Sequence, residues 1–130
     1  MMTDTTPRNQ AGGDPSGCLF CGIVAGDIPA DIVRTDARTV AFRDIQPQAP
    51  VHVLVVPRRH LTNASTVADH DADDVVALLV AAKAVADQEG IGGDDRGYRL
   101  VFNVGPDALN SVPHLHLHVL GGRRFDWPPG

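Results

Sequence analysis

Three histidines alternate with apolar residues near the end of the chain, in the segment His114-Leu-His-Leu-His-Val-Leu120. Successive side chains of a β-strand point to opposite faces, so this alternation places His114, His116 and His118 on one face. Neighbouring imidazoles then lie about 6.6 Å apart, since a strand rises about 3.3 Å per residue. They can share one phosphate-sized ligand, and a neutral imidazole is a competent nucleophile toward phosphorus.

Two other interpretations of these histidines stay open from the residues alone. A half-buried strand alternates in any case, so the pattern is also compatible with a polar, solvent-facing strand surface. Three imidazoles are also a ligand set for a catalytic metal, although such ligands usually converge from more than one element.

A second group of reactive side chains begins with Cys18 and Cys21. Their Cys-x-x-Cys spacing is typical of metal binding or redox chemistry more than of a structural disulfide. A redox pair usually follows a strand, and residues 14–17 do not form one. Two cysteines are too few for a structural zinc site, but His60 and His114 complete a set of four if the fold brings them together. A pair of small buried apolar side chains is the remaining interpretation.

The apolar patterning around these residues predicts a single α+β domain. Residues 1–17 have almost no apolar side chains and are expected to be a disordered tail, so the folded domain spans residues 18–130. A short N-terminal helix is expected to follow Cys18 and to end before Pro29. Strands are expected at residues 39–43, 51–56, 98–104 and 114–120, and one long helix at residues 69–89. Short loops between neighbouring strands imply an antiparallel sheet with the long helix on one face.

The overall composition limits the class of protein. A chain of 130 residues with 43% hydrophobic content suits one domain with one modest core. The formal net charge of -5 argues against a nucleic-acid partner, but a small anionic ligand needs only local donors. The sequence has neither an apolar run of about 18 residues, as a membrane span needs, nor a secretory signal, so a cytoplasmic protein is expected.

Together these motifs resemble the histidine triad (HIT) superfamily, whose signature is three histidines alternating with apolar residues. The resemblance runs from about Cys18 to Gly130 and includes residues 41–45, 48–60 and 97–101. The ending Trp127-Pro-Pro-Gly130 is similar to that of the Hint branch, whose members are purine nucleoside phosphoramidases. The resemblance implies a HIT-like antiparallel sheet with one long and one short N-terminal helix, and it implies a homodimer.

The resemblance also implies roles around the phosphate. His116 matches the nucleophile, and its other ring nitrogen is expected to donate to a backbone carbonyl. His118 and His52 are expected to point at the phosphate, where His118 donates to an oxygen. Ser111 relays a proton to the leaving group, and Asn103 is a further polar contact; without the resemblance, Ser111 is equally well explained as a loop hydrogen bond.

On the nucleoside side, the resemblance implies that Asp44 accepts from both ribose hydroxyls, although aspartate is also a common turn residue. Trp127 is expected to reach toward the partner's site, the alternative being a frayed terminus. The apolar walls for a purine are expected from Phe42 and Ile45, with Phe20 and Ile28; each is also explained as a core residue.

Several bacterial members of the superfamily bind zinc, so the resemblance favours a structural zinc ion on Cys18, Cys21, His60 and His114. No organic cofactor is implied. One segment departs from the family: residues 109–113 read Leu-Asn-Ser-Val-Pro, where the family usually has Gly-Gln-Ser-Val and an aromatic residue. The proline removes a backbone donor, which puts leaving-group handling and rate in question.

The function implied is cleavage of adenosine or guanosine 5′-phosphoramidates, including aminoacyl adenylates, through a nucleotidyl intermediate on His116. The same nucleophile would serve a dinucleoside polyphosphate hydrolase or a nucleotidyltransferase of the superfamily. A third hypothesis is a non-catalytic nucleotide-binding module, which would bind a monophosphate tightly without turnover that depends on His116.

Overall fold

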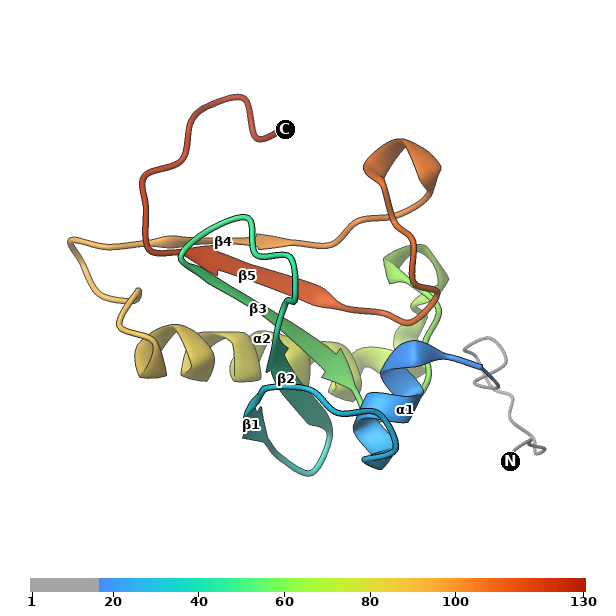
Figure 1. The fold of residues 1–130 in the computed structure, drawn as a ribbon. Coiled ribbons are helices and arrows are strands. Elements are labelled where there is room, and N and C mark those ends of the chain that lie inside the picture. Colours follow the sequence, from blue (N-terminus) through green and yellow to red (C-terminus); the bar gives the residue numbers. More distant parts are fainter. Residues whose placement is uncertain (1–16) are drawn as a thin grey trace.

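The computed structural model describes residues 17–130, so almost the whole predicted tail lies outside the described residues. A five-stranded antiparallel sheet with the strand order β1-β2-β3-β5-β4 forms its centre (Figure 1). The strands are β1 (Ile32–Thr35), β2 (Thr39–Arg43), β3 (Val51–Pro57), β4 (Tyr98–Val101) and β5 (Leu117–Gly121). The predicted α+β class is confirmed.

Two α-helices accompany the sheet, α1 (Leu19–Ala25) and α2 (Ala72–Gln88). α1 begins after Cys18 and ends at Gly26, which has the left-handed conformation common at helix C-termini. The helix predicted from residue 69 starts with a 3-10 turn, Asp69–Asp71, and becomes α-helical at Ala72. Within residues 17–130, no helix has the length and apolar character needed to cross a membrane.

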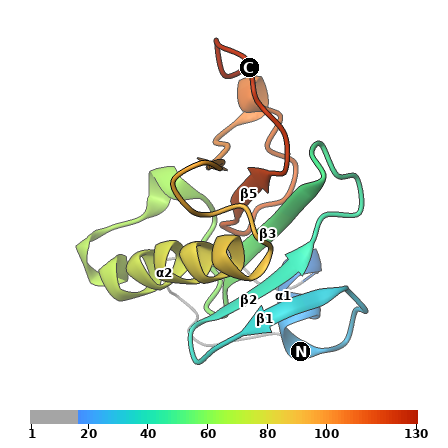
Figure 2. The same cartoon turned by 90° about the vertical axis from the view of Figure 1, so that its left-hand side faces the viewer.

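Each face of the sheet is covered by one helix, α2 on one side and α1 on the other (Figures 1 and 2). Alternate residues of β2 and β3 point to the two faces, as the period of a strand requires. The face under α2 contains Ala41, Val53, Val55, Leu117 and Val119, which pack with Leu78, Ala82 and Val85 of the helix. The face under α1 contains Val40, Phe42, Leu54 and Val56, which pack with Phe20.

β1, β4 and β5 differ from the prediction, β5 because it begins at Leu117 and not at His114. β1 was missed because it has only four residues, lies at the sheet edge and exposes both its ends, so it carries no apolar alternation. The strand predicted at residues 98–104 ends at Val101, whose pairing with His118 is the last contact between β4 and β5. The chain beyond Val101 leaves the sheet, so that Asn103 lies beside a pocket.

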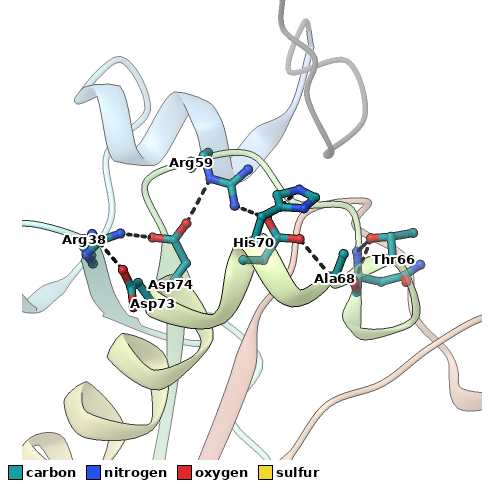
Figure 3. A network of polar contacts seen from close by, with 9 residues as sticks. Arg38, Arg59, Thr66, Ala68, His70, Asp73 and Asp74 are labelled. Carbon is teal, nitrogen blue, oxygen red and sulfur yellow. Dashed lines mark hydrogen bonds and ion pairs between the residues drawn. The ribbon is translucent and has the colours of Figure 1, made fainter.

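A polar network fastens the segment after β3 to the start of α2 (Figure 3). Nε of Arg59 donates to Asp74 at 2.9 Å, and a terminal nitrogen of the same guanidinium contacts the fully buried carboxylate of Asp71. The second oxygen of Asp71 accepts from the backbone N–H of Ala68 at 2.9 Å. Arg38, just before β2, donates to Asp74 at 3.0 Å. The chain that leaves β3 is therefore held against the N-terminus of α2.

We expect Asp71→Asn to lower the free energy of unfolding by about 2 kcal/mol near pH 7, because it removes a buried charge-assisted contact at constant side-chain size. Burial alone would raise the pKa of Asp71, but Arg59 and the amide of Ala68 outweigh it and hold the pKa below its ordinary value. Such a carboxylate stabilises the fold above its unfolded pKa of about 3.9, and this contribution is lost as the pH falls through the lower native pKa. Urea unfolding should therefore show the two proteins converging below about pH 4.

Asp87→Asn is the matched control, because this exposed carboxylate pairs with Lys83 on the surface of α2 at 3.4 Å. Its unfolding free energy should stay within about 0.5 kcal/mol of the unaltered protein. Equal losses in the two variants, or a loss for Asp71→Asn that persists in acid, would contradict the role given to the buried carboxylate.

Candidate functional site

The three histidines of the predicted strand serve two different groups of residues. β5 begins at Leu117 because Pro113 has no N–H to pair and the chain bends at residues 113 and 114. His114 is fully buried and its ring faces the cysteines near the N-terminus. The rings of His116 and His118 stay together, with centroids 5.0 Å apart. Leu115 packs with Leu117 and Val119 under α2, and Phe20 of α1 contacts the rings of both His114 and His116, so the predicted alternation holds. The expected start of the strand at residue 114 is wrong, because β5 begins at Leu117.

The backbone of His114 orients the ring of His116. Nδ1 of His116 lies 2.7 Å from the carbonyl oxygen of His114. A carbonyl oxygen only accepts, so Nδ1 carries the proton and Nε2 keeps a free lone pair. Burial lowers the pKa of His116 below its ordinary value, which favours the neutral ring. The ring thus presents an unprotonated nitrogen, as a nucleophile toward phosphorus requires.

A chain of hydrogen bonds sets the tautomer of His118. The backbone N–H of Gln48 donates to Nδ1 of His52 at 3.0 Å. The proton of neutral His52 is therefore on Nε2, which donates to Nδ1 of His118 at 2.9 Å. Burial, followed by the neighbouring His116, lowers the pKa of His118 to about 4, so this ring is also neutral. Its remaining proton is on Nε2, which makes Nε2 a hydrogen-bond donor. The side-chain amide of Asn103 lies 3.5 Å from Nε2 and accepts this proton when its oxygen occupies that position.

Asp44 lies beside this chain at the end of β2. Its Oδ2 is 3.4 Å from Nε2 of His52, and its Oδ1 accepts from the backbone N–H of Gln46 at 2.8 Å. Asp44, His52 and His118 also have the composition of a metal site. A metal would need the lone pair of Nε2 in His52, but the N–H of Gln48 already takes Nδ1 and leaves the proton on Nε2. We therefore interpret these residues as a hydrogen-bonded chain.

A pocket of about 460 Å³ opens beside His116 and His118, within the size range of small-molecule sites. The ring of Phe20 packs edge-on against His116, with centroids 5.1 Å apart. Its apolar walls come from Leu19, Phe20, Ile23, Ile28, Phe42, Ile45, Leu54, Leu109 and Val112. Its polar side chains come from Arg43, Asp44, Gln46, Asn103 and Ser111. A mostly apolar pocket with few polar groups suits a flat aromatic ligand that carries one polar end.

Most residues predicted for nucleotide binding line this pocket: Phe42, Asp44, Ile45, Asn103, Ser111, His116 and His118. Two do not line it. His52 is buried and contacts His118 instead. Trp127 is 82% exposed on the C-terminal tail, where its ring lies 6.0 Å from the guanidinium of Arg99.

Two features of the site escaped the sequence reasoning. The donor that orients His52 is the backbone amide of Gln48, which any residue except proline supplies, so it leaves no signal. Leu109 has a φ of 60°, a left-handed conformation that costs a side chain with a Cβ about 1–2 kcal/mol. Its signal was the departure of residues 109–113 from the family pattern.

Cys18, Cys21, His60 and His114 form a second cluster, and their donor atoms all lie within 4.8 Å of one another. Nδ1 of His114 is 3.4 Å from each cysteine sulfur, and Nδ1 of His60 is 3.2 Å from the sulfur of Cys21. Nε2 of His114 donates to the carbonyl of Pro57 at 3.0 Å, so Nδ1 presents its lone pair to the sulfurs. Two thiols and two imidazoles are a ligand set for tetrahedral zinc.

Without a metal, Cys21 and His114 of this cluster are both neutral, so a cation would have to displace the thiol proton of Cys21. Burial and the adjacent Cys18 raise the pKa of the Cys21 thiol to about 12. Burial also lowers the pKa of His114 to about 4, so the imidazole is neutral and able to coordinate. A divalent cation would stabilise the thiolates that the buried cluster otherwise disfavours.

Fold and site together define a small α+β protein with a neutral histidine pair in a pocket and a cysteine–histidine cluster behind it. The HIT domain family matches residues 25–125, and the chain belongs to this family. The 14 kDa zinc-binding protein of Zea mays is 43% identical over 119 residues, which cover 90% of this chain and 91% of that protein.

Solved structures agree with this assignment. A HIT family hydrolase from Legionella pneumophila has a TM-score of 0.83 and 47% identity, covering 88% of this chain and all 100% of its own. A zinc-bound histidine triad family protein from Mycobacterium smegmatis has a TM-score of 0.71 and 30% identity, covering 86% of this chain and 79% of its own.

We expect ¹⁵N NMR of the histidine rings near pH 7 to find His52 and His118 neutral with the proton on Nε2, and His116 neutral with the proton on Nδ1. The hydrogen bonds above impose each of these tautomers. His70, whose side chain is 69% exposed, serves as the internal reference. A proton on Nε2 of His116, or a doubly protonated His118 at this pH, would contradict the geometry.

Proposed function

We propose that this protein is a nucleotide hydrolase that cleaves purine nucleoside 5′-phosphoramidates through a covalent nucleotidyl intermediate on His116. One observation carries the proposal: the 2.7 Å contact between Nδ1 of His116 and the carbonyl of His114, which directs an unprotonated Nε2 to the reaction. The similar protein from Legionella pneumophila is a HIT family hydrolase, which supports the reaction class.

In the first step, Nε2 of His116 forms a bond to the α-phosphorus, and the bond from phosphorus to the leaving amine breaks. The imidazole becomes positively charged as it bonds, and its Nδ1–H then donates more strongly to the His114 carbonyl. The leaving amine takes up a proton, which the hydroxyl of Ser111 at the pocket is suited to relay.

In the second step, water attacks the phosphorus and gives up a proton to the solvent, and the bond from phosphorus to His116 breaks. This releases the nucleoside monophosphate and restores the neutral ring. Nε2 of His118 donates to a phosphate oxygen in both steps. The hydrogen bonds from Gln48 through His52 leave the proton of His118 on this nitrogen. His52 acts through His118, as a positioning residue.

Residues that line the pocket are suited to contact the purine and the ribose of the nucleoside. Phe42 and Ile45, with Phe20 and Ile28, supply apolar walls for the purine, and the carboxylate of Asp44 is available to the ribose hydroxyls. Asp44 keeps this capacity while Gln46 and His52 hold it in place.

We infer that Cys18, Cys21, His60 and His114 hold a structural zinc ion. The donor set fits the ion, and the zinc-binding names of the Zea mays relative and the Mycobacterium smegmatis structure support it. Bound zinc would fix the ring of His114 and stabilise the thiolates, and it would take no part in the reaction itself.

A homodimer is part of the proposal. Val76, Leu79 and Val80 expose apolar side chains on α2, and Leu100 does so on β4, which is an edge strand of the sheet. Pairing of a second chain with this helix and edge would cover both.

We expect His116→Ala to reduce AMP release from adenosine 5′-phosphoramidate by a factor on the order of 10⁴, because the nucleophile is lost. Quenched reactions of the unaltered protein should carry an added AMP on His116 by mass spectrometry. His70→Ala, which changes an exposed histidine, should retain full turnover. Equal turnover in the unaltered protein and His116→Ala would refute the proposal, and tight AMP binding without turnover would favour a non-catalytic binding module.

For the metal, we expect about one zinc per chain in protein that was produced with zinc and washed with a chelator. Cys18→Ser should lose the ion but keep α1, because serine is also a good N-cap and can replace the sulfur that accepts from Cys21. Elemental analysis measures the first result and circular dichroism the second. Protein without zinc after such production would refute the site.

A further inference from the structure

Leu109 combines a strained backbone with an exposed apolar side chain. Among residues 17–130, it is the residue other than glycine that has a positive φ, 60°, and its side chain is 86% exposed. It ends the 3-10 turn Pro106–Ala108, and its N–H donates to the carbonyl of Pro106 at 3.0 Å. The next N–H, of Asn110, closes the loop onto the carbonyl of Gly105 at 3.1 Å.

Neither the backbone nor the core accounts for a leucine at this position. The loop requires a left-handed residue, which glycine or asparagine supplies with less strain. A side chain that is 86% exposed gains almost nothing from burial. Strain that folding does not explain is often retained at functional sites.

The exposed side chain of Leu109 lines the pocket that contains His116 and His118. Ser111 and Val112 of the same loop line it too. Leu109 is therefore two residues from the hydroxyl that the proposed reaction places beside the leaving group. We therefore expect the apolar surface that it adds to face the leaving group.

The charged residues of the pocket also favour an uncharged leaving group. Of the described lining residues, Arg43 and Asp44 are the ones with formal charge when the histidines are neutral. The guanidinium of Arg43 is already paired, with Glu89 at 2.7 and 3.1 Å and with Asp31 at 3.4 Å. The pocket therefore offers no unpaired cationic side chain to a leaving group that carries negative charge, such as a polyphosphate.

We propose that Leu109 is a specificity-determining residue, which contacts the substituent of the leaving amine and selects apolar amines over anionic leaving groups. This inference rests on the proposed function and narrows its substrate class. The same preference would favour phosphoramidates over dinucleoside polyphosphates as substrates, although the nucleophile His116 could attack both.

The test compares adenosine 5′-phosphoramidates of n-butylamine and of 4-aminobutyrate, which differ in a terminal methyl or carboxylate, together with the unsubstituted phosphoramidate. The unaltered protein should show a higher kcat/KM for the butyl compound. Leu109→Gly and Leu109→Asn should each reduce this preference, measured as the ratio of the two kcat/KM values, by about fivefold to tenfold. Ile32→Ala, which shortens an exposed side chain on β1 outside the pocket, should keep the full preference.

Thermal unfolding supplies the second measurement. Both Leu109 variants should be at least as stable as the unaltered protein, because they suit the left-handed backbone, so a lost preference will not reflect damage to the fold. Turnover that depends on His116 but shows no butyl preference, or a preference that both variants keep, would overturn this inference alone. Absence of His116-dependent turnover with all three compounds would overturn the proposed function and this inference with it.

Discussion

The hydrogen bond from Nδ1 of His116 to the carbonyl of His114 is the contact on which the rest of the site depends. It exists because the chain bends before β5, so that a backbone carbonyl lies under the ring of the second histidine. The same bend turns the ring of His114 away from the pocket and toward Cys18 and Cys21. One short segment therefore supplies a reactive ring to the pocket and a metal ligand to the cysteine cluster.

α1 belongs to both clusters. Its N-cap is Cys18, whose sulfur accepts from the backbone N–H of Cys21, and two residues later Phe20 packs edge-on against His116. The helix has only seven residues and a single buried side chain, so its own hydrogen bonds hold it weakly. The cysteine cluster and the contact of Phe20 with Phe42 supply the tertiary packing that such a short helix needs.

The sequence predicted the elements whose patterns are local. Residues 39–43 were placed as a strand with the bounds of β2, and the long helix was placed to within a 3-10 turn. It failed where a neighbouring strand or a backbone group decides: β1 is defined by its pairing with β2, and the start of β5 by the bend at Pro113. The approach of Cys18 to His114 spans 96 residues, so no local pattern contains it, and it was expected only through the family resemblance.

His114 is placed as a metal ligand and its carbonyl supports His116, so this segment also limits how the sequence can change during evolution. Substitutions in the loop from Gly105 to Asn110 would alter the pocket and leave the sheet in place, because that loop lies outside the sheet. A single residue gained or lost between His114 and His118 would move the supporting carbonyl and exchange inward and outward side chains at once. New specificities are therefore expected to arise by changes in the loop, while the spacing of the histidines stays constant.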